Sequence, residues 1–175
     1  MPTPTFTLIA SSTVGSGGAS FIDFSSIPST YTDLVLYISA RSARTTGGTD
    51  TMRVEINNST TNFTFRALEG DGATAYSTSG STGFIGNLPQ EAGSTGWTAN
   101  TFCSNFLYFP NYAGSTNKSF STDATTENNS TTSYADLIAS LWSQTTAINQ
   151  LTLKSGNAAN FVQYSSAYLY GIVKS

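Results

Sequence analysis

The feature that most constrains this fold is a series of short segments in which apolar and polar residues alternate, separated by turn-forming residues about every 8–12 positions. The clearest segment ends at Arg41, and one set of its alternate residues is wholly apolar: Leu34, Leu36, Ile38 and Ala40. A period of two places these side chains on one face of a β-strand. The opposite face turns polar only towards the end, which predicts a central strand whose start is covered on both sides.

The same pattern predicts about ten short strands and therefore an all-β, antiparallel β-sandwich or barrel. The predicted ranges are 6–10, 20–24, 34–41, 52–56, 63–68, 102–109, 118–126, 134–142, 148–154 and 161–173. Met52, Val54 and Ile56 are expected to face the core. The turn after Ile56 predicts that 52–56 and 63–68 form a hairpin, and residues 69–83 are expected to form a long loop.

One segment, 134–142, fits two kinds of secondary structure. Its apolar residues recur at helical spacing, as an amphipathic helix of two to three turns requires; they are Leu137, Ile138, Leu141 and Trp142. The segment also lies among β-rich neighbours and follows the turn-forming sequence at 127–130. We expect a strand.

The domain organisation follows from uniform composition. No Pro/Gly-rich linker divides the chain, so we expect one β-sandwich domain over residues 1–175. Pro2 and Pro4 prevent a regular helix in residues 1–5, which could form an extended N-terminal arm. No apolar run approaches the ~18 residues of a membrane span, and the N-terminus lacks the pattern of a secretion signal. A membrane partner is therefore not expected.

The surface is predicted to be polar but poorly charged. Ser and Thr account for 54 of 175 residues, only 10% are charged, and the formal net charge is −3. Non-specific nucleic-acid binding needs clustered Lys and Arg, so nucleic acid is not an expected partner. Arg41 and Arg44 come closest to a cluster and are expected at a solvated edge. A surface with few strongly hydrated charges favours close packing against another protein.

The residues that usually carry catalysis are scarce. The chain has no His and one Cys, Cys103, so neither a Ser-His-Asp triad nor a His-activated thiol can form. We expect Cys103 to be a small buried apolar residue on a strand. Ten carboxylates are dispersed, mostly at turns: Asp23, Asp33, Asp50, Glu55, Glu69, Asp71, Glu91, Asp123, Glu127 and Asp136. No catalytic residue, metal site or cofactor is predicted, and the protein is not expected to be an enzyme.

Aromatic residues in or beside predicted loops are the candidate contact surface. They are Tyr76, Trp97, Tyr112 and Trp142. Exposed Tyr and Trp bury much area with little loss of rotamer freedom, which suits both protein contacts and stacking on sugars. The alternative is that these rings close the ends of the sandwich. Tyr168 and Tyr170 are instead expected on one face of a sheet.

Three stretches resemble segments common in virion proteins of tailed bacteriophages, cyanophages among them. They are 24–36 (FSSIPSTYTDLVL), 110–115 (PNYAGS) and 163–172 (QYSSAYLYGI), and the likeness extends over nearly the whole chain. In that group the module occurs within tail-fibre-like proteins and as a free-standing small protein. The resemblance implies a jelly-roll-like sandwich without a catalytic site.

Two functions follow from this resemblance. No fibre shaft or coiled coil accompanies the module in this sequence, which favours a capsid decoration, or cement, protein on the outside of the virion. Its expected partner is the major capsid protein, with self-association as a dimer or trimer. The alternative is a tail-fibre or tail-tip module whose loop aromatics bind a host surface glycan.

Overall fold

The computed structural model describes residues 5–47, 49–91, 98–127, 129 and 133–173, and within them the chain forms twelve strands. Their bounds are β1 (Phe6–Thr13), β2 (Ile22–Phe24), β3 (Asp33–Ser39), β4 (Asp50–Ile56), β5 (Phe63–Gly70), β6 (Ala75–Gly80), β7 (Phe84–Leu88), β8 (Ser104–Phe109), β9 (Lys118–Thr125), β10 (Ala135–Trp142), β11 (Leu151–Ser155) and β12 (Ser166–Ile172).

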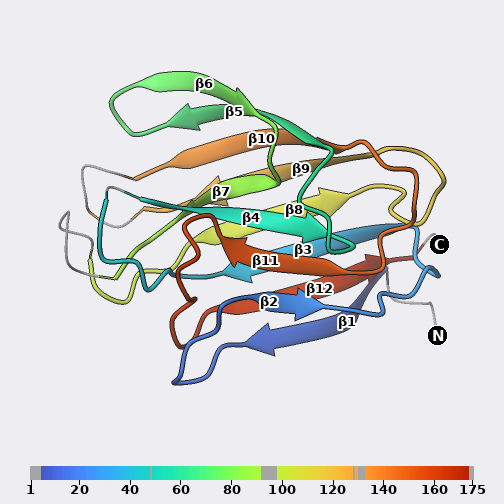
Figure 1. The fold of residues 1–175 in the computed structure, drawn as a ribbon, viewed down its shortest axis with the longest axis horizontal. Helices are drawn as coiled ribbons and strands as arrows, with labels where there is room; N and C mark the ends of the chain where they lie inside the picture. The colour runs from blue at the N-terminus through green and yellow to red at the C-terminus, as the bar shows by residue number, and fades with distance from the viewer. Residues whose placement is uncertain (1–4, 48, 92–97, 128, 130–132, 174–175) are drawn as a thin grey trace.

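The strands form two sheets. One has eight strands in the order β1-β12-β3-β8-β9-β10-β5-β6, and the other has four in the order β2-β11-β4-β7. Every pairing between neighbouring strands is antiparallel. Figure 1 shows β5 and β6 extending beyond the four-stranded sheet. The predicted antiparallel β-sandwich is confirmed, and the described residues contain no helix, hence none that could span a membrane.

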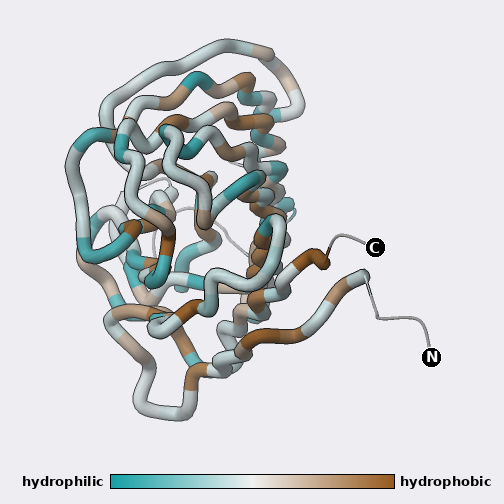
Figure 2. The backbone as a smooth tube through the Cα atoms, turned by 90° about the vertical axis from the view of Figure 1, so that its right-hand side faces the viewer, coloured by the Kyte–Doolittle hydropathy of each residue, from teal (hydrophilic) through white to brown (hydrophobic). Residues whose placement is uncertain are grey.

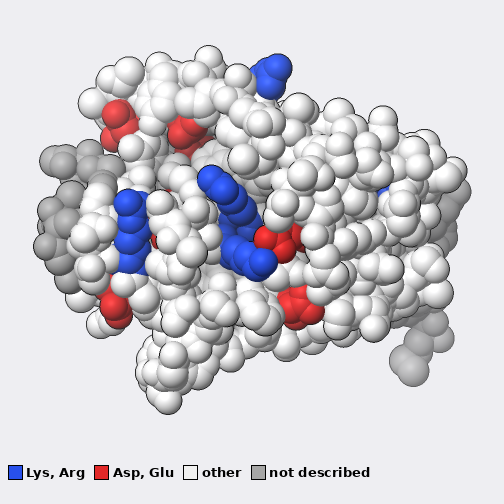
Figure 3. Space-filling view, in the orientation of Figure 1, with Lys and Arg blue, Asp and Glu red and all other residues white. Residues whose placement is uncertain are grey.

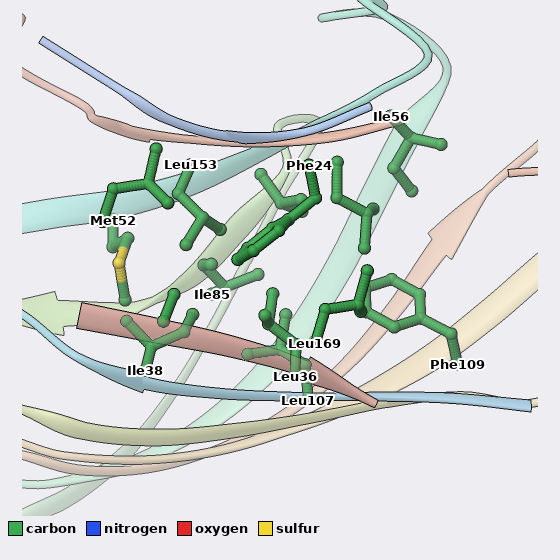
Figure 4. Packing of buried hydrophobic residues seen from close by; sticks show 14 of the residues in the cluster. Phe24, Leu36, Ile38, Met52, Ile56, Ile85, Leu107, Phe109, Leu153 and Leu169 are labelled. Carbon is green, nitrogen blue, oxygen red and sulfur yellow. The ribbon is translucent and has the colours of Figure 1, made fainter. Parts of the chain in front are cut away.

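The main core lies between the sheets. In Figure 4, Met52 and Leu153 from the four-stranded sheet point towards Leu36 and Leu169 of the eight-stranded sheet, and all four are fully buried. The predicted inward faces of 34–41 and 52–56 are confirmed, as is the cover on both sides at the start of β3, where Val35 is also buried. Hydrophobic and hydrophilic residues alternate along the chain in Figure 2, as strands with two unlike faces require.

The ambiguous segment 134–142 is a strand, as expected. In β10 the residues Asp136, Ile138, Ser140 and Trp142 are buried, while Leu137 is exposed. This burial pattern has a period of two. An amphipathic helix would bury Leu137 and Ile138 together. In the strand they point to opposite faces, because adjacent strand residues alternate.

The predicted hairpin between 52–56 and 63–68 is wrong. β4 pairs with β11 and β7 in the four-stranded sheet, whereas β5 pairs with β10 and β6 in the other. The Asn57 amide donates to the Ala147 carbonyl, and its Oδ1 accepts from the Gln150 backbone. These contacts tie the turn to the segment that enters β11, so the chain crosses between the sheets after β4.

The predicted long loop over 69–83 is also wrong. β5 continues to Gly70, and Ala75–Gly80 returns as β6, with an unbroken register against β5. Asp71 closes the hairpin, since its Oδ1 accepts from the backbone nitrogens of Ala73 and Thr74. The sequence of β6 is almost wholly small and polar, so it carries no apolar alternation to mark a strand.

Three further expectations concern single positions or the terminus. Cys103 is buried as expected, but it precedes β8 and lies outside a strand. Arg41 is buried too, so the expected solvated edge is wrong for this residue. Of the proposed arm at 1–5, residues 1–4 lie outside the described residues. The carbonyl of Thr5 accepts from the Val173 nitrogen at 3.0 Å.

Candidate contact surfaces

The outward face of the eight-stranded sheet, called the outer face below, carries a cluster of aromatic side chains. Tyr168, Tyr37 and Phe106 are cross-strand partners on β12, β3 and β8, so their side chains share this face. The ring centroids of Tyr37 and Phe106 are 5.2 Å apart, and those of Tyr37 and Tyr170 are 5.9 Å apart. Tyr37 and Tyr168 are exposed. The predicted placement of Tyr168 and Tyr170 on one face is confirmed.

Neighbouring contacts fix this aromatic cluster in place. The hydroxyl of Tyr108 donates to Asp33 at 2.8 Å, which holds the phenol along the sheet. Val35 points to the same face, with Tyr108 and Tyr170 as its cross-strand partners, and it is buried. The rings therefore form a layer over the sheet and are preorganised for contact, with little rotamer freedom left to lose.

An aliphatic pair extends the outer face towards β6. Leu68 on β5 and Leu137 on β10 lie directly opposite each other and are 62% and 60% exposed. They line a shallow hollow of about 710 Å³ over β5, β6, β9 and β10. Beneath them, the rings of Phe65 and Phe84 pack at 5.0 Å between centroids and support this part of the sheet.

The outer face is almost free of charge. Among the described strand residues of the eight-stranded sheet, the outward-facing charged side chains are Asp33, Arg66 and Asp123. Asp33 is engaged by Tyr108 and by the Asn111 backbone. Figure 3 shows basic and acidic side chains at several places on the side seen in Figure 1. Lys154 on β11 and Glu55 on β4 form an ion pair at 2.8 Å. Asp123 separates the aromatic cluster from the Leu68–Leu137 pair, because it is the cross-strand partner of both Phe106 and Leu137. Exposed apolar side chains with few charges are typical of protein interaction surfaces.

The aromatics predicted to form a contact surface do not lie together on it. Tyr112 and Trp142 are buried, which corrects the expectation that their rings are exposed. The Tyr112 hydroxyl donates to the Pro28 carbonyl, and the Trp142 ring packs against Phe63 at 6.4 Å between centroids. These two rings close the sandwich, as the alternative interpretation held.

The other two predicted contact residues have different outcomes. Tyr76 lies on the inward face of β6 opposite Glu69 and is half-buried. Burial raises the pKa of the Tyr76 phenol, and its contact with Tyr134 adds to the rise. Trp97 lies outside the described residues, so its predicted role stays a prediction.

One pair of carboxylates is brought together, but away from solvent. Asp136 on β10 and Glu69 on β5 are directly opposite each other on the inward face, and both are buried. Burial raises the pKa of Asp136 to about 6, the hydrogen bond from Asn87 opposes this rise, and the charge of Glu69 adds to it. Paired carboxylates in glycosidases flank a bound substrate. Here the two side chains are 8% and 3% exposed and border a cavity of about 330 Å³ beside β6.

The Cys103 thiol is buried. Burial raises the pKa of the Cys103 thiol to about 12, so the reactive thiolate is scarce at neutral pH. Among the described residues, no group of three or more Cys, Asp or Glu side chains could hold a metal ion. Among the described residues, the exposed apolar side chains of the outer face are therefore the candidate contact surface.

Comparisons with known proteins add no family assignment: no family model, no curated protein and no solved structure matches the chain.

The outer face was not predicted as a surface, although the sequence carries a signal for it. The alternation that placed Leu36 and Ile38 inward also placed Tyr37 outward. The predicted strand that contains Tyr168 and Tyr170 presents tyrosines at the same period. What the sequence did not reveal is that these strands are neighbours, which is why the aromatics of three strands meet.

Proposed function

We propose that this protein is a virion structural protein of a tailed bacteriophage and that it decorates the capsid. It binds the outside of the shell through its outer face and bridges neighbouring copies of the major capsid protein. The observation that carries this proposal is the aromatic, nearly uncharged outer face. The resemblance of three sequence segments to phage virion proteins supplies the biological setting.

The dimensions of the outer face fit a stable protein contact. Eight strands about 4.8 Å apart and roughly 20 Å long present a face of roughly 750 Å². A standard specific interface buries about 800 Å² on each partner. The exposed rings Tyr37 and Tyr168 belong to a residue type that often dominates binding energy at interfaces. The exposed Leu68 and Leu137 add apolar area at the other half.

The strand order supports the jelly-roll form of the sandwich. In an eight-stranded jelly roll numbered along the chain, the sheets have the orders 1-8-3-6 and 2-7-4-5. Without β5, β6, β9 and β10, the two sheets here become β1-β12-β3-β8 and β2-β11-β4-β7, which correspond to those orders. The four remaining strands form two added hairpins, β5-β6 and β9-β10, that widen the larger sheet.

The proposed mechanism is stabilisation by mass action, without catalysis or a cofactor. A protein that binds only the assembled shell shifts the equilibrium towards assembly by its binding free energy. Bridging requires one copy to touch more than one capsid subunit, or several copies to touch each other. Self-association as a dimer or trimer serves the second route, and it stays a prediction.

Copy number on the particle tests the proposal. Purified virions labelled with an antibody against this protein, and quantified by mass spectrometry, should carry hundreds of copies distributed over the head. A few dozen copies confined to the tail would reject capsid decoration in favour of the tail-tip alternative. Absence from washed virions would reject both.

A further inference from the structure

A cleft at one end of the sandwich has features that the shell contact does not use. It has a volume of about 630 Å³ and is lined by loops that are distant in sequence. Its described lining includes Arg41, Glu91, Asn100, Phe102, Asn160 and Tyr164. This set combines a cation, amides and aromatic rings in one concave surface, a mixture typical of small-molecule sites.

Backbone hydrogen bonds hold the walls of the cleft. The Val162 nitrogen donates to the Arg41 carbonyl at 3.0 Å, and the Glu91 nitrogen donates to the Ser42 carbonyl at 2.9 Å. Ala19 and Phe161 exchange a pair of backbone hydrogen bonds at 3.0 and 2.7 Å. The loops at 15–18, 89–91 and 160–164 are thus joined to each other or to the chain after β3. Backbone hydrogen bonds therefore fix the walls of the cleft relative to the sandwich.

Arg41 is the unusual group in this cleft. It is only 4% exposed, and its Nε has no hydrogen-bond acceptor among the described residues. Burial lowers the pKa of the guanidinium while the charge of Glu91 raises it, and arginine remains protonated at neutral pH. A buried guanidinium whose Nε lacks an acceptor is unfavourable, and Arg41 belongs to the lining of the cleft, where an acceptor could reach the guanidinium. A carboxylate is the acceptor whose geometry matches its planar fork of donors.

Tyr164 presents an aromatic ring at the rim of the same cleft. Its side chain is 70% exposed, although its backbone has φ 72° in the left-handed region. A bulky non-glycine residue rarely adopts this conformation, and such strain concentrates at functional sites. Two backbone hydrogen bonds enforce it: the Tyr164 nitrogen donates to the Val14 carbonyl at 3.0 Å, and the Val14 nitrogen donates to the Ser165 carbonyl at 2.8 Å.

We propose that this cleft binds an acidic sugar, a uronic acid residue whose carboxylate pairs with Arg41. Tyr164 and Phe102 offer aromatic faces to the sugar ring. Asn100 and Asn160 offer amides to its hydroxyls. Glu91 is exposed, so water screens its repulsion of the bound carboxylate, and it accepts a hydrogen bond from a ring hydroxyl. The proposal is independent of the shell contact, because none of these residues lies on the outer face.

Titration of the full-length protein with two matched sugars tests the site. Methyl β-D-glucuronide carries the carboxylate, and methyl β-D-glucoside has the same ring without it. By calorimetry, the glucuronide should bind at least about tenfold more tightly than the glucoside. Arg41→Gln should remove this preference. Tyr164→Gly should weaken both sugars by about three- to tenfold.

A control and a competing ligand complete the experiment. Tyr37→Ser, which removes an exposed ring from the outer face, should leave both affinities unchanged. If Arg41→Gln unfolds, the comparison of the two sugars on the unaltered protein and the Tyr164→Gly variant still decide. Equal affinity for both sugars, or no binding of either, overturns the proposal. N-acetylglutamate represents the carboxylate of a protein side chain. If it binds more tightly than the glucuronide, the cleft prefers a protein carboxylate and the proposal is overturned.

Discussion

Replacement of Asp136 by Asn should make this protein more stable at neutral pH. The Asp136 carboxyl is 3% exposed, and its Oδ1 has no hydrogen-bond partner among the described residues. Its Oδ2 accepts from the Asn87 amide at 3.1 Å, and the Asn side chain of the variant retains an oxygen for that bond. The substitution therefore removes a buried charge beside Glu69 and keeps the shape of the side chain.

The size of the effect follows from the pKa of Asp136, which burial raises from 3.8 to about 6. A shift of about 2 units corresponds to about 3 kcal/mol. Because the folded protein holds this proton more tightly than the unfolded chain, the free energy of unfolding falls as pH rises from about 4 through about 6. Asp136→Asn should thus add up to about 3 kcal/mol at pH 8 and nothing below about pH 4.

Urea unfolding of both proteins between about pH 4 and pH 8 measures this difference directly. Asp123→Asn is the matched control, because Asp123 lies on the neighbouring strand β9 but is exposed. That variant should change the unfolding free energy by less than about 0.5 kcal/mol. A free energy of unfolding for Asp136→Asn at pH 8 that equals or falls below that of the unaltered protein would show that the buried charge does not destabilise the fold.

Three further predictions concern the interior. Asp50→Ala should lower the free energy of unfolding by about 4 kcal/mol, measured by urea unfolding. The buried Asp50 carboxylate accepts hydrogen bonds from the side chains of Ser42, Ser155 and Asn157 and from the Thr51 nitrogen. A loss below about 1 kcal/mol would contradict this prediction. Gly83→Ala should lower the melting temperature, because a Cβ there would lie 2.1 Å from the Val54 carbonyl oxygen. Gly17→Ala, with open space around it, is its control, and equal melting of the two variants would count against the packing. Cys103 should resist a thiol reagent at pH 8 until the protein is denatured, and rapid labelling of the native protein would show that the thiol is accessible.

Local alternation predicted which face each strand buries, because a period of two depends only on neighbouring residues. The inward positions Leu36, Val54 and Ile56 are buried as expected. The β-rich neighbours and the preceding turn identified β10 as a strand despite the helical spacing of its apolar residues. These successes share one property, which is that no information from a distant part of the chain is needed.

Strand pairing could not be predicted in the same way. The turn at Asn57 looks like a hairpin in sequence, but its side chain bonds to residues about ninety positions away. β6 forms from small polar residues because β5 offers a free edge to pair with. Such contacts are set by the three-dimensional arrangement, so turn-forming residues alone do not distinguish a hairpin from a crossing between sheets.

The exposure of the candidate contact residues could not be predicted for the same reason. Loop position suggested an exposed Tyr112, yet its hydroxyl is used to anchor the Pro28 carbonyl and its ring closes the sandwich. Tyr37 lies in the middle of a strand that is buried at its start, so its exposure depends on β3 having an uncovered outer side. Tyr112 and Trp142 are buried in the sandwich and Tyr37 is not. The exposure of an aromatic side chain therefore depends on how the sheets pack.

We propose that the outer face makes the contact with the capsid shell. The most direct test of this contact is cosedimentation of the purified protein with shells that lack it, comparing the unaltered chain with a Tyr37→Ser/Phe106→Ser double variant of verified melting temperature. We predict that the variant binds at least about tenfold more weakly. Undiminished binding of a folded double variant would contradict the account.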